Sequence, residues 1–406
     1  MKSNTRMIVL DDDPTGIQTV HGCLLVTDWS DSVIRQAFDH EEPFFYILTN
    51  TRAMTRDEAA RTTRSAMEAV IRANRLLGYR LIFVSRSDSC LRGHFPLETD
   101  VMEQVLHEAG YKVWPKVPFC PAFIESGRYT IDGVHYMKDP ATQQLIPVSE
   151  TEFAHDNVFG YHTSVLRDYI TEKGADASHY QIVNAQGYDE LYAFCEQLEE
   201  ETATFNGAIV IRSSSSLPKA LSGIADQPLL TREALMGKKE GAGCYIVGSH
   251  VQKTTRQLMA LLKEEGVQGI ELPVSEILGQ PAQLMSRVLK EMHQLAATGI
   301  TPVVYTSRQE VRVDDPDKRQ QLGKRVSDFL VSIVQKLPYT PSYLVAKGGI
   351  TSHDILTVGL GVKVATVMGQ AINSVPCIMT DDFAYIIFPG NVGGDDSLAE
   401  IYRKFR

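Results

Sequence analysis

The sequence Ile8-Val9-Leu10-Asp11-Asp12-Asp13-Pro14-Thr15-Gly16 indicates the fold of the N-terminal half of the chain. Its apolar residues are typical of a buried strand, and three aspartates follow them directly. In α/β proteins, ligand sites form at the carboxyl edge of the sheet, where these carboxylates would lie. They could bind Mg²⁺, accept hydrogen bonds from a polyol or deprotonate a hydroxyl. The non-functional alternative is a solvated turn formed by Asp and Pro.

Short apolar runs alternate with helical patterns through most of the chain. The runs that we expect to form buried strands are Met7–Leu10, Phe44–Leu48, Leu81–Val84, Ala208–Ile211, Tyr245–Val247, Pro302–Tyr305 and Tyr343–Ala346. Helical patterns cover Thr55–Leu77, Leu97–Ala109, Thr255–Glu265 and Gln320–Leu337. Gly110 and Gly266 follow two of them, as helix-ending residues do. This alternation predicts an α/β fold with mainly parallel sheets.

A domain boundary is expected between Leu217 and Gly243. This stretch is rich in glycine and proline and contains the charged run Lys238–Glu240. The pattern on both sides of it is α/β. We therefore expect two α/β domains, residues 1–235 and 243–406, with an inter-domain cleft that holds the active site.

The composition excludes several classes of protein. The 406 residues include 40 basic and 50 acidic side chains, for a net charge of −10, and 43% are hydrophobic. These values are typical of a folded protein. The net negative charge gives no basic surface to attract nucleic acid or an anionic membrane. The composition does not exclude a homo-oligomer. The six cysteines form no C-x-x-C pair, which argues against disulfides and a cysteine zinc site. With neither a signal peptide nor a run of about 18 apolar residues, we expect a cytoplasmic protein.

A second polar segment follows the strand expected at Leu81–Val84. Ser85-Arg86-Ser87-Asp88-Ser89-Cys90-Leu91-Arg92-Gly93 contains two arginines, one aspartate and three hydroxyls. Arginine suits carboxylates and phosphates, and hydroxyls suit polyols. Arg52, after the strand Phe44–Leu48, could join them at the same sheet edge. The alternative for any single residue is an Arg–Asp ion pair that only fixes a loop.

A third segment, Pro121–Tyr136, contains Gly127 and Gly133, which suggest a structured loop rather than the interior of a strand. It also contains His135, which could carry a proton. A lone histidine in a loop more often has a structural role, and we favour that interpretation here.

In the C-terminal half, three apolar runs lead into glycine turns. These are Tyr245–His250 with Gly248-Ser249, Val345–Asp354 with Gly348-Gly349, and Tyr385–Gly394 with Pro389-Gly390. Glycine lets a phosphate approach the backbone, so three such turns in one domain favour nucleotide phosphate binding. The segment Gly248–Thr254 lacks the second glycine of a P-loop, and Val364 replaces the third glycine of a dinucleotide fingerprint. The metalloprotease motif H-E-x-x-H and the hydrolase motif G-x-S-x-G do not occur.

In order along the chain, these motifs resemble those of the four-carbon acid sugar kinase family, which includes 3-oxo-tetronate, threonate and erythronate kinases. Asp12–Gly16 is similar to its D-D-x-T-G, Asp88–Gly93 to its D-S-T-L-R-G and Pro121–Tyr136 to its P-A-F-x-x-x-G-R segment. In the second half, Gly248-Ser249 with Thr255-Arg256-Gln257 resembles its G-S and T-x-x-Q segments, and Gly348–Thr351 its G-G-x-T loop.

The resemblance implies an N-terminal domain that binds the sugar acid and a C-terminal domain that binds ATP. By position, the substrate residues would be Asp12, Arg52, Arg86, Ser87, Asp88 and Ser89, and the nucleotide residues Ser249, Gly348, Gly349, Ile350, Thr351 and Gly390. This chain departs from the pattern at three positions. Arg86 stands where many members have Lys, and Ile350 and Phe388 replace the Asp or Glu and the Lys of many relatives.

Phosphoryl transfer requires charge neutralisation, an anion cradle and a positioned hydroxyl. Arg52, Arg86 and Arg92 would hold the carboxylate of the acid, and Mg²⁺ would bridge phosphates and carboxylates. An aspartate from Asp12, Asp13 or Asp88 would orient or deprotonate the hydroxyl, with Asp12 and Asp88 as the preferred candidates. One alternative is a non-catalytic two-domain protein that binds a small anion. Another is a metal-dependent aldolase or lyase, which would need clustered histidines that the sequence lacks.

Overall fold

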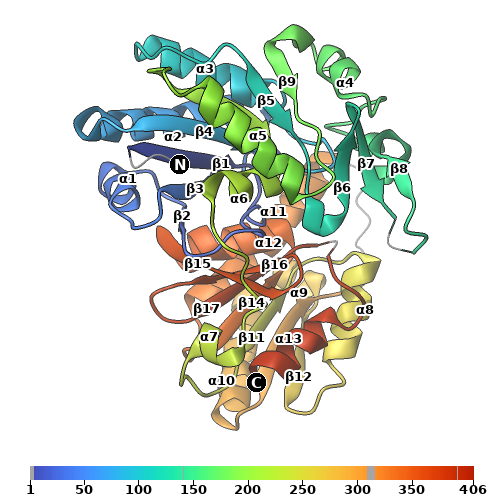
Figure 1. The fold of residues 1–406 in the computed structure, drawn as a ribbon. Helices are drawn as coiled ribbons and strands as arrows, with labels where there is room; N and C mark the ends of the chain where they lie inside the picture. The colour runs from blue at the N-terminus through green and yellow to red at the C-terminus, as the bar shows by residue number, and fades with distance from the viewer. Residues whose placement is uncertain (1–3, 140, 309–315, 391) are drawn as a thin grey trace. The chain divides into compact units, whose positions relative to one another are not determined.

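Strand β1 (Thr5–Asp11) is an inner strand of a parallel sheet, as the apolar run at Ile8–Leu10 predicts, and Met7 to Asp11 are all buried (Figure 1). The computed structural model describes residues 4–139, 141–308, 316–390 and 392–406. The chain divides into two units, Met1–Asp226 and Gln227–Arg406. Each unit has its own sheet and its own helices, and we describe each by itself.

The sheet of the first unit is parallel at every pair of neighbouring strands. Its strand order is β2 (Leu24–Val26), β3 (Phe44–Leu48), β1, β4 (Arg80–Arg86), β10 (Ile209–Ser213), β5 (Val117–Cys120) and β9 (Tyr180–Ile182). In this register, Asp11 is opposite Leu48 of β3 and Arg86 of β4, and Arg86 is opposite Ser213 of β10. The carboxyl ends of four strands therefore meet at one edge of the sheet.

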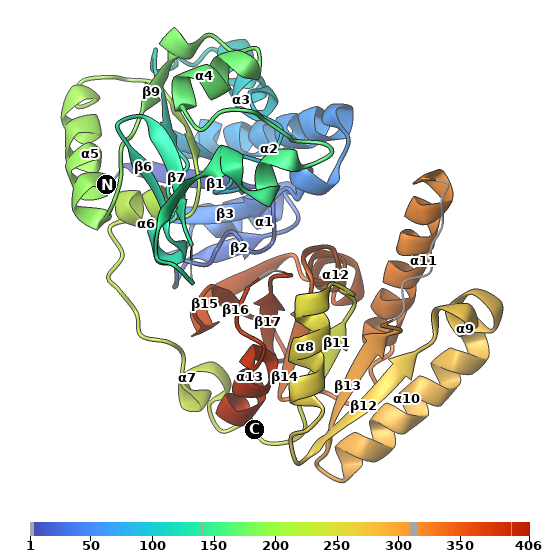
Figure 2. The same cartoon turned by 90° about the vertical axis from the view of Figure 1, so that its right-hand side faces the viewer.

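Helices cover both faces of this sheet. Figure 2 shows α1 (Asp31–Phe38), α2 (Arg56–Leu77) and α3 (Leu97–Glu108) on one side, and α5 (Tyr188–Glu201) and α6 (Ser216–Ser222) on the other. The start of α2 is fixed by a capping box between Thr55 and Glu58. The shorter α4 (Leu166–Glu172) packs near β5 and β9, where Tyr169, Phe119 and Tyr180 belong to one apolar core.

The segment Pro121–Tyr136 differs from a simple structured loop. Arg128–Ile131 (β6) and Val134–Lys138 (β7) form an antiparallel hairpin, which β8 (Leu145–Pro147) extends. Gly127 and Gly133 lie outside the strands, as expected, and both have a positive φ. The turns were therefore predictable from their glycines, whereas the short strands on either side of Gly133 were not.

The sheet of the second unit has a parallel part and an antiparallel part. Its strand order is β12 (Val267–Leu272), β13 (Thr301–Thr306), β11 (Cys244–Val247), β14 (Tyr343–Lys347), β17 (Ala384–Phe388), β16 (Val375–Met379) and β15 (Val364–Ile372). The strands from β12 to β17 are parallel, and β16 and β15 are antiparallel neighbours. The carboxyl ends of β11, β14 and β17 lie side by side.

The helices of the second unit are α7 (Arg232–Met236), α8 (Gln252–Leu261), α9 (Val274–Gly279), α10 (Pro281–Ala297), α11 (Pro316–Gln335), α12 (Gly349–Asp354) and α13 (Ser397–Phe405), with a π-helix at Ile355–Gly359. The α8 and α13 helices contribute Leu258 and Leu398 to the same core as Val345 of β14. The predicted fold, two α/β domains with mainly parallel sheets, is confirmed. In the described ranges, no helix has the length and apolar character that a membrane span needs.

Candidate functional site

The first feature of the site is the pair formed by Asp11, at the end of β1, and Arg86, at the end of β4. Arg86 donates from Nη1 to Oδ1 of Asp11 over 3.0 Å and from Nη2 to the Ser215 hydroxyl over 3.0 Å. Both side chains are buried. Burial raises the pKa of Asp11 to about 7, although the positive charge of Arg86 opposes this shift. Asp11 is therefore a carboxyl group that can hold a proton near neutral pH.

Arg52 joins the other two aspartates. It lies in a short 3₁₀ turn (Thr51–Ala53) directly after β3, and donates from Nε to Asp12 Oδ2 over 3.1 Å and from Nη1 to Asp13 Oδ2 over 3.2 Å. The hydroxyl of Ser87 donates to Asp12 over 2.5 Å. Burial alone would raise the pKa of Asp13, but the charge of Arg52 and hydrogen bonds from Thr15 lower it. Two arginines thus form ion pairs with three adjacent carboxyl groups.

Asp88 and Arg92 form a second pair in the loop after β4. Arg92 donates from Nε to Asp88 Oδ2 over 2.7 Å, and its guanidinium lies 4.9 Å from the centre of the Phe153 ring. Burial would raise the pKa of Asp88, but the charges of Arg52 and Arg92 outweigh it and lower the pKa to about 2. Asp88 is therefore ionised at any physiological pH.

His135 supports this loop from the hairpin. Its Nε2 lies 2.8 Å from the carbonyl oxygen of Ser89, and its Nδ1 lies 3.0 Å from the hydroxyl of Thr130. Burial lowers the pKa of His135 to about 4, so the ring is neutral at pH 7. Both ring nitrogens already have partners, which agrees with the structural role favoured above.

Arg212 and Glu98, which were not among the predicted site residues, are buried beside them. Arg212, in β10, donates from Nη1 to Glu98 over 2.5 Å and to the Ser85 hydroxyl over 2.7 Å. Together with Asp88 and Ser213, it lines a small cavity. Arg212 directly follows the strand expected at Ala208–Ile211, and an arginine at the end of an expected strand is a signal that could have identified it.

Gly93 is required where these groups converge. It has a φ of +131°, and a Cβ atom there would lie 2.4 Å from the Ser87 hydroxyl, 3.1 Å from Asp12 and 3.2 Å from Arg212. No other residue type fits both the backbone conformation and the space. The close approach of this loop to Asp12 therefore depends on the glycine.

The acidic cluster does not have the properties of a resident metal site. Among the described residues, no three His, Cys, Asp or Glu side chains are arranged to hold a metal ion. Asp11, Asp12 and Asp13 instead have guanidinium partners. A magnesium ion bound by these three carboxylates would have to displace the arginines, so the residues present do not fit one.

The second unit brings together the loops after β11 and β14. Gly348 has a φ of +119°, and a Cβ atom there would lie 3.3 Å from that of Ser249. A Cβ atom on Gly248 would lie 2.2 Å from the hydroxyl of Thr351. The Ser249 hydroxyl accepts a hydrogen bond from Thr254 over 3.2 Å. Ser249, Gly348 and Thr351 are therefore neighbours.

The loop after β17 is tied to these two loops by polar side chains. Lys347, next to Gly348, donates to the carbonyl oxygens of Pro389 and Gly390. Gln257, in α8, donates to the carbonyls of Val392 and Gly394 over 3.0 and 2.9 Å. A Cβ atom on Gly390 would meet no atom within 4 Å, so its backbone faces open space.

Glycine is needed at Gly248 and Gly348 because a side chain there would collide with Thr351 or Ser249, and Gly390 has open space beside it. Gly349 starts α12, and the side chain of Ile350 lies outside the described part of the structure.

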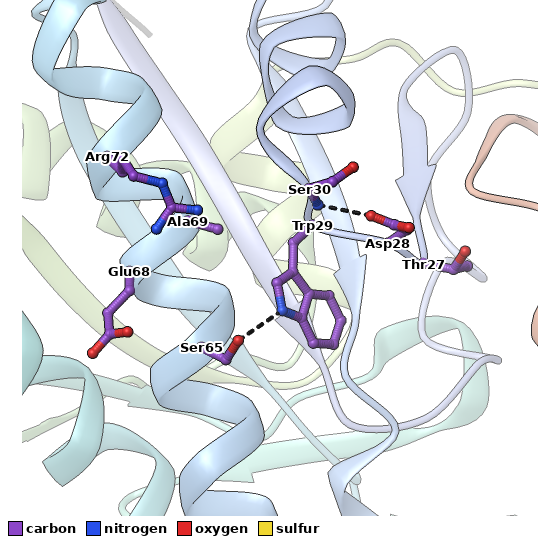
Figure 3. A pocket seen from close by; sticks show the side chains of 8 residues that line it. All are labelled: Thr27, Asp28, Trp29, Ser30, Ser65, Glu68, Ala69 and Arg72. Carbon is purple, nitrogen blue, oxygen red and sulfur yellow. Dashed lines mark hydrogen bonds between the residues drawn. The ribbon is translucent and has the colours of Figure 1, made fainter.

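A separate hollow of about 420 Å³ lies between the start of α1 and α2 (Figure 3). Its lining includes Trp29, which donates from Nε1 to the Ser65 hydroxyl over 3.0 Å, and Asp28, which accepts from the Ser30 amide over 2.7 Å. It contains none of the predicted site residues, so we do not assign it to the candidate site.

Comparison with known families agrees with this division of roles. Residues 7–216 match the family model described as a sugar-binding N-terminal domain, and residues 244–398 match that of a nucleotide-binding C-terminal domain. The molecule is therefore a two-domain protein with a sugar-binding and a nucleotide-binding domain. The chain belongs to the family that combines these two domains, consistent with the four-carbon acid sugar kinase family that its motifs resemble.

Two solved structures share the fold. One is a Salmonella typhimurium LT2 protein provisionally assigned as a tRNA synthase, with a TM-score of 0.68 and 16% identity over 99% of this chain and 100% of the other. The second is a Haemophilus influenzae protein of the DUF1537 family, with a TM-score of 0.64 and 16% identity over 98% of this chain and 100% of the other. No curated protein matches the sequence.

Proposed function

We propose that this protein is an ATP-dependent kinase that phosphorylates a hydroxyl of a small four-carbon sugar acid, such as 3-oxo-tetronate, threonate or erythronate. The main support is the cluster of Arg52, Arg86 and Arg92 paired with aspartates in a domain of the sugar-binding type. Arginine at a partly exposed site suits the carboxylate of an acid, and aspartate suits its hydroxyls. The domain of nucleotide-binding type supplies the second substrate site.

The arginines differ in how they can act on the acid. Arg52 and Arg92 are 19% and 24% exposed, so we propose that these two contact its carboxylate. Arg86 is 5% exposed and would act by holding Asp11 and Asp12 in place. Ser87 and Ser89 complete the loop, with the Ser87 hydroxyl bound to Asp12.

Asp12 and Asp88 are the proposed catalytic residues. Asp88 is 13% exposed and Asp12 only 1%, so Asp88 is the better placed to meet a hydroxyl. A carboxyl group with a pKa of about 2 is a weak base. Phosphoryl transfer asks little of the base, because its transition state is largely dissociative and positioning dominates. We propose that Asp88 orients the acceptor hydroxyl and accepts its proton late in the reaction.

ATP supplies the phosphoryl group when bound, and we propose that Ser249, Gly348, Gly349, Ile350, Thr351 and Gly390 hold it. Among these loops, the backbone at Gly390 has open space beside it, and Gly349 begins α12, where helix-start amides can bind anionic oxygens. We propose that Mg²⁺ arrives bound to the nucleotide, since the acidic cluster does not fit a resident ion. The domain limits 1–235 and 243–406 and a cleft between them remain predictions.

The test is to mix purified protein with MgATP and each of several four-carbon sugar acids and to measure ADP release. We expect turnover with at least one acid and none without an acid. No turnover with any acid, together with no ATP binding by calorimetry, would disprove the kinase proposal.

The same assay tests a second candidate, a non-catalytic protein that binds a small anion. The buried Arg–Asp pairs support this candidate as much as they support a kinase. Arginines in such a cluster would bind a small anion whether or not a reaction follows. Calorimetric binding of an acid without any ADP release in its presence would support this candidate. Conversion of the acid without ATP would instead indicate a lyase.

A further inference from the structure

Lys347 is a fully buried cation in the middle of the second unit. It is the last residue of β14, opposite Val247 of β11 on one side and Phe388 of β17 on the other. Its side chain is 0% exposed, and Nζ lies 2.5 Å from the carbonyl oxygen of Pro389 and 3.0 Å from that of Gly390. Nζ also lies 4.1 Å from the centre of the Phe388 ring.

The stability of the fold does not explain this lysine. Within the described ranges, no carboxylate forms a salt bridge with it. Burial lowers its pKa to about 7, and the like charge of Lys253 adds to this shift. A buried ammonium without a carboxylate costs free energy that an apolar side chain of similar length would not. Strongly shifted groups of this kind concentrate at functional sites.

The contacts of the ammonium point to the nucleotide loops. Lys347 immediately precedes Gly348 and Gly349, and its two carbonyl partners belong to the loop that contains Gly390. One side chain therefore joins the loops after β14 and β17. Lys347 also lies opposite Phe388, the last residue of β17, so its cation stands where the two strands lead into these loops.

We propose that Lys347 is a positioning residue for nucleotide phosphates, which fixes the Pro389–Gly390 loop and places a positive charge next to the glycine turns. This inference rests on the proposed nucleotide site. It assigns Lys347 two effects that can be separated, because a neutral amine still donates hydrogen bonds to the carbonyls but no longer attracts an anion. The experiment must therefore distinguish the positive charge of Lys347 from its hydrogen bonds to the Pro389–Gly390 loop.

The experiment is calorimetric titration of MgATP into the full-length protein and three variants, Lys347→Met, Lys347→Arg and Lys290→Met, at pH 6 and pH 9. Lys290 is exposed on α10 and controls for the loss of one positive charge. At pH 6 we expect Lys347→Met to weaken ATP binding about tenfold. We expect Lys347→Arg to retain more affinity than Lys347→Met, and the control to match the wild type.

The pH comparison distinguishes charge from structure. The wild-type ammonium loses its proton as the pH rises above about 7, so its advantage over Lys347→Met should shrink several-fold between pH 6 and pH 9. The comparison is the ratio of the ATP affinities of the wild type and Lys347→Met at one pH, so the ionisation of ATP itself cancels.

Thermal melting without nucleotide gives a second readout. Because a buried charge is removed, we expect Lys347→Met to melt at or above the wild-type temperature at pH 6.

The outcomes separate this inference from the proposed function. A wild-type protein that binds no ATP would disprove the nucleotide site itself. A wild-type protein that binds ATP, with Lys347→Met equal to it at both pH values, would disprove the role of Lys347 alone. A Lys347→Met protein that fails to fold would show that the ammonium is structural and would also overturn the proposal.

Discussion

Asp11 differs from the two aspartates that follow it in how its carboxyl group is held. Its Oδ1 accepts from Arg86, but its Oδ2 is buried with no hydrogen-bond partner among the residues that the structure describes. Asp12 and Asp13 both accept hydrogen bonds from Arg52. An unpartnered, buried oxygen favours the protonated form, which explains why the pKa of Asp11 is raised to about 7. The pKa of Asp11 is thus raised while that of Asp13, which Arg52 and Thr15 stabilise, is lowered.

This difference predicts a pH dependence of stability. The folded pKa of Asp11 lies above its ordinary value of 3.8, so the folded state holds a proton that the unfolded state releases. The resulting stability is fully present below about pH 4 and is lost as the pH rises through 7. We expect Asp11→Asn, which cannot titrate, to lose less unfolding free energy than the wild type between pH 5 and pH 8, by on the order of 2 kcal/mol.

Urea denaturation at the two pH values measures this difference. The exposed Asp381→Asn is the charge-matched control and should follow the wild type. The pKa of His135 falls from its ordinary 6.5 to about 4 on folding, which adds a pH dependence near this range; it is common to all of these proteins and cancels in the comparison. Equal pH dependence in Asp11→Asn and the wild type would show that Asp11 is ionised throughout this range.

At the scale of elements, the turn after β1 is packed directly against the side chain at the end of that strand. A Cβ atom on Gly16 would lie 2.0 Å from Oδ2 of Asp11. Asp11 cannot move aside easily, because it is fully buried and bound to Arg86. We expect Gly16→Ala to lower the unfolding free energy by about 1–3 kcal/mol and to reduce acid binding by disturbing Arg86.

The control for this substitution is Gly279→Ala, at the end of α9. An added Cβ atom there meets no atom within 4 Å, and the residue lacks a positive φ. Chemical denaturation of both variants measures the effect. If Gly16→Ala were as stable as Gly279→Ala, the turn after β1 would have more freedom than its contacts indicate.

The strand ends could be predicted from the sequence, but the contacts between them could not. Apolar runs at Ile8–Leu10 and Phe44–Leu48 predicted β1 and β3, because a strand covered on both faces has a continuous apolar pattern. Strand order depends on pairing between distant segments. The pairs Arg52–Asp12 and Arg86–Asp11 therefore became visible only in the structure.

Short or polar segments were missed for a local reason. The apolar run that predicted β10 stops at Ile211, so the polar end of the strand, Arg212 and Ser213, was not included. The antiparallel strands β15 and β16 were also missed, although β15 (Val364–Ile372) alternates between buried and partly exposed residues. Lys347 was part of a predicted glycine turn, but its burial depends on the neighbouring strands β11 and β17.

At the scale of the whole molecule, the candidate residues separate by unit. The acidic and arginine cluster lies within Met1–Asp226, and the glycine loops lie within Gln227–Arg406. Each unit has its own buried core, with Phe119 and Tyr169 in the first and Val345 and Leu398 in the second. If one substrate binds to each unit, each ligand alone should protect backbone amides in one unit only, because ligand binding suppresses local opening around its site.

Hydrogen exchange measured by mass spectrometry on the full-length protein tests this separation. With MgATP we expect slower exchange in peptides that contain Gly248, Gly348 and Gly390, and with threonate or erythronate in peptides that contain Asp12 and Arg92. The hollow around Trp29 is an internal control that neither ligand should protect. If MgATP protected the Asp12 peptides and left all three glycine loops unchanged, the assignment of nucleotide and acid to the two units would be wrong.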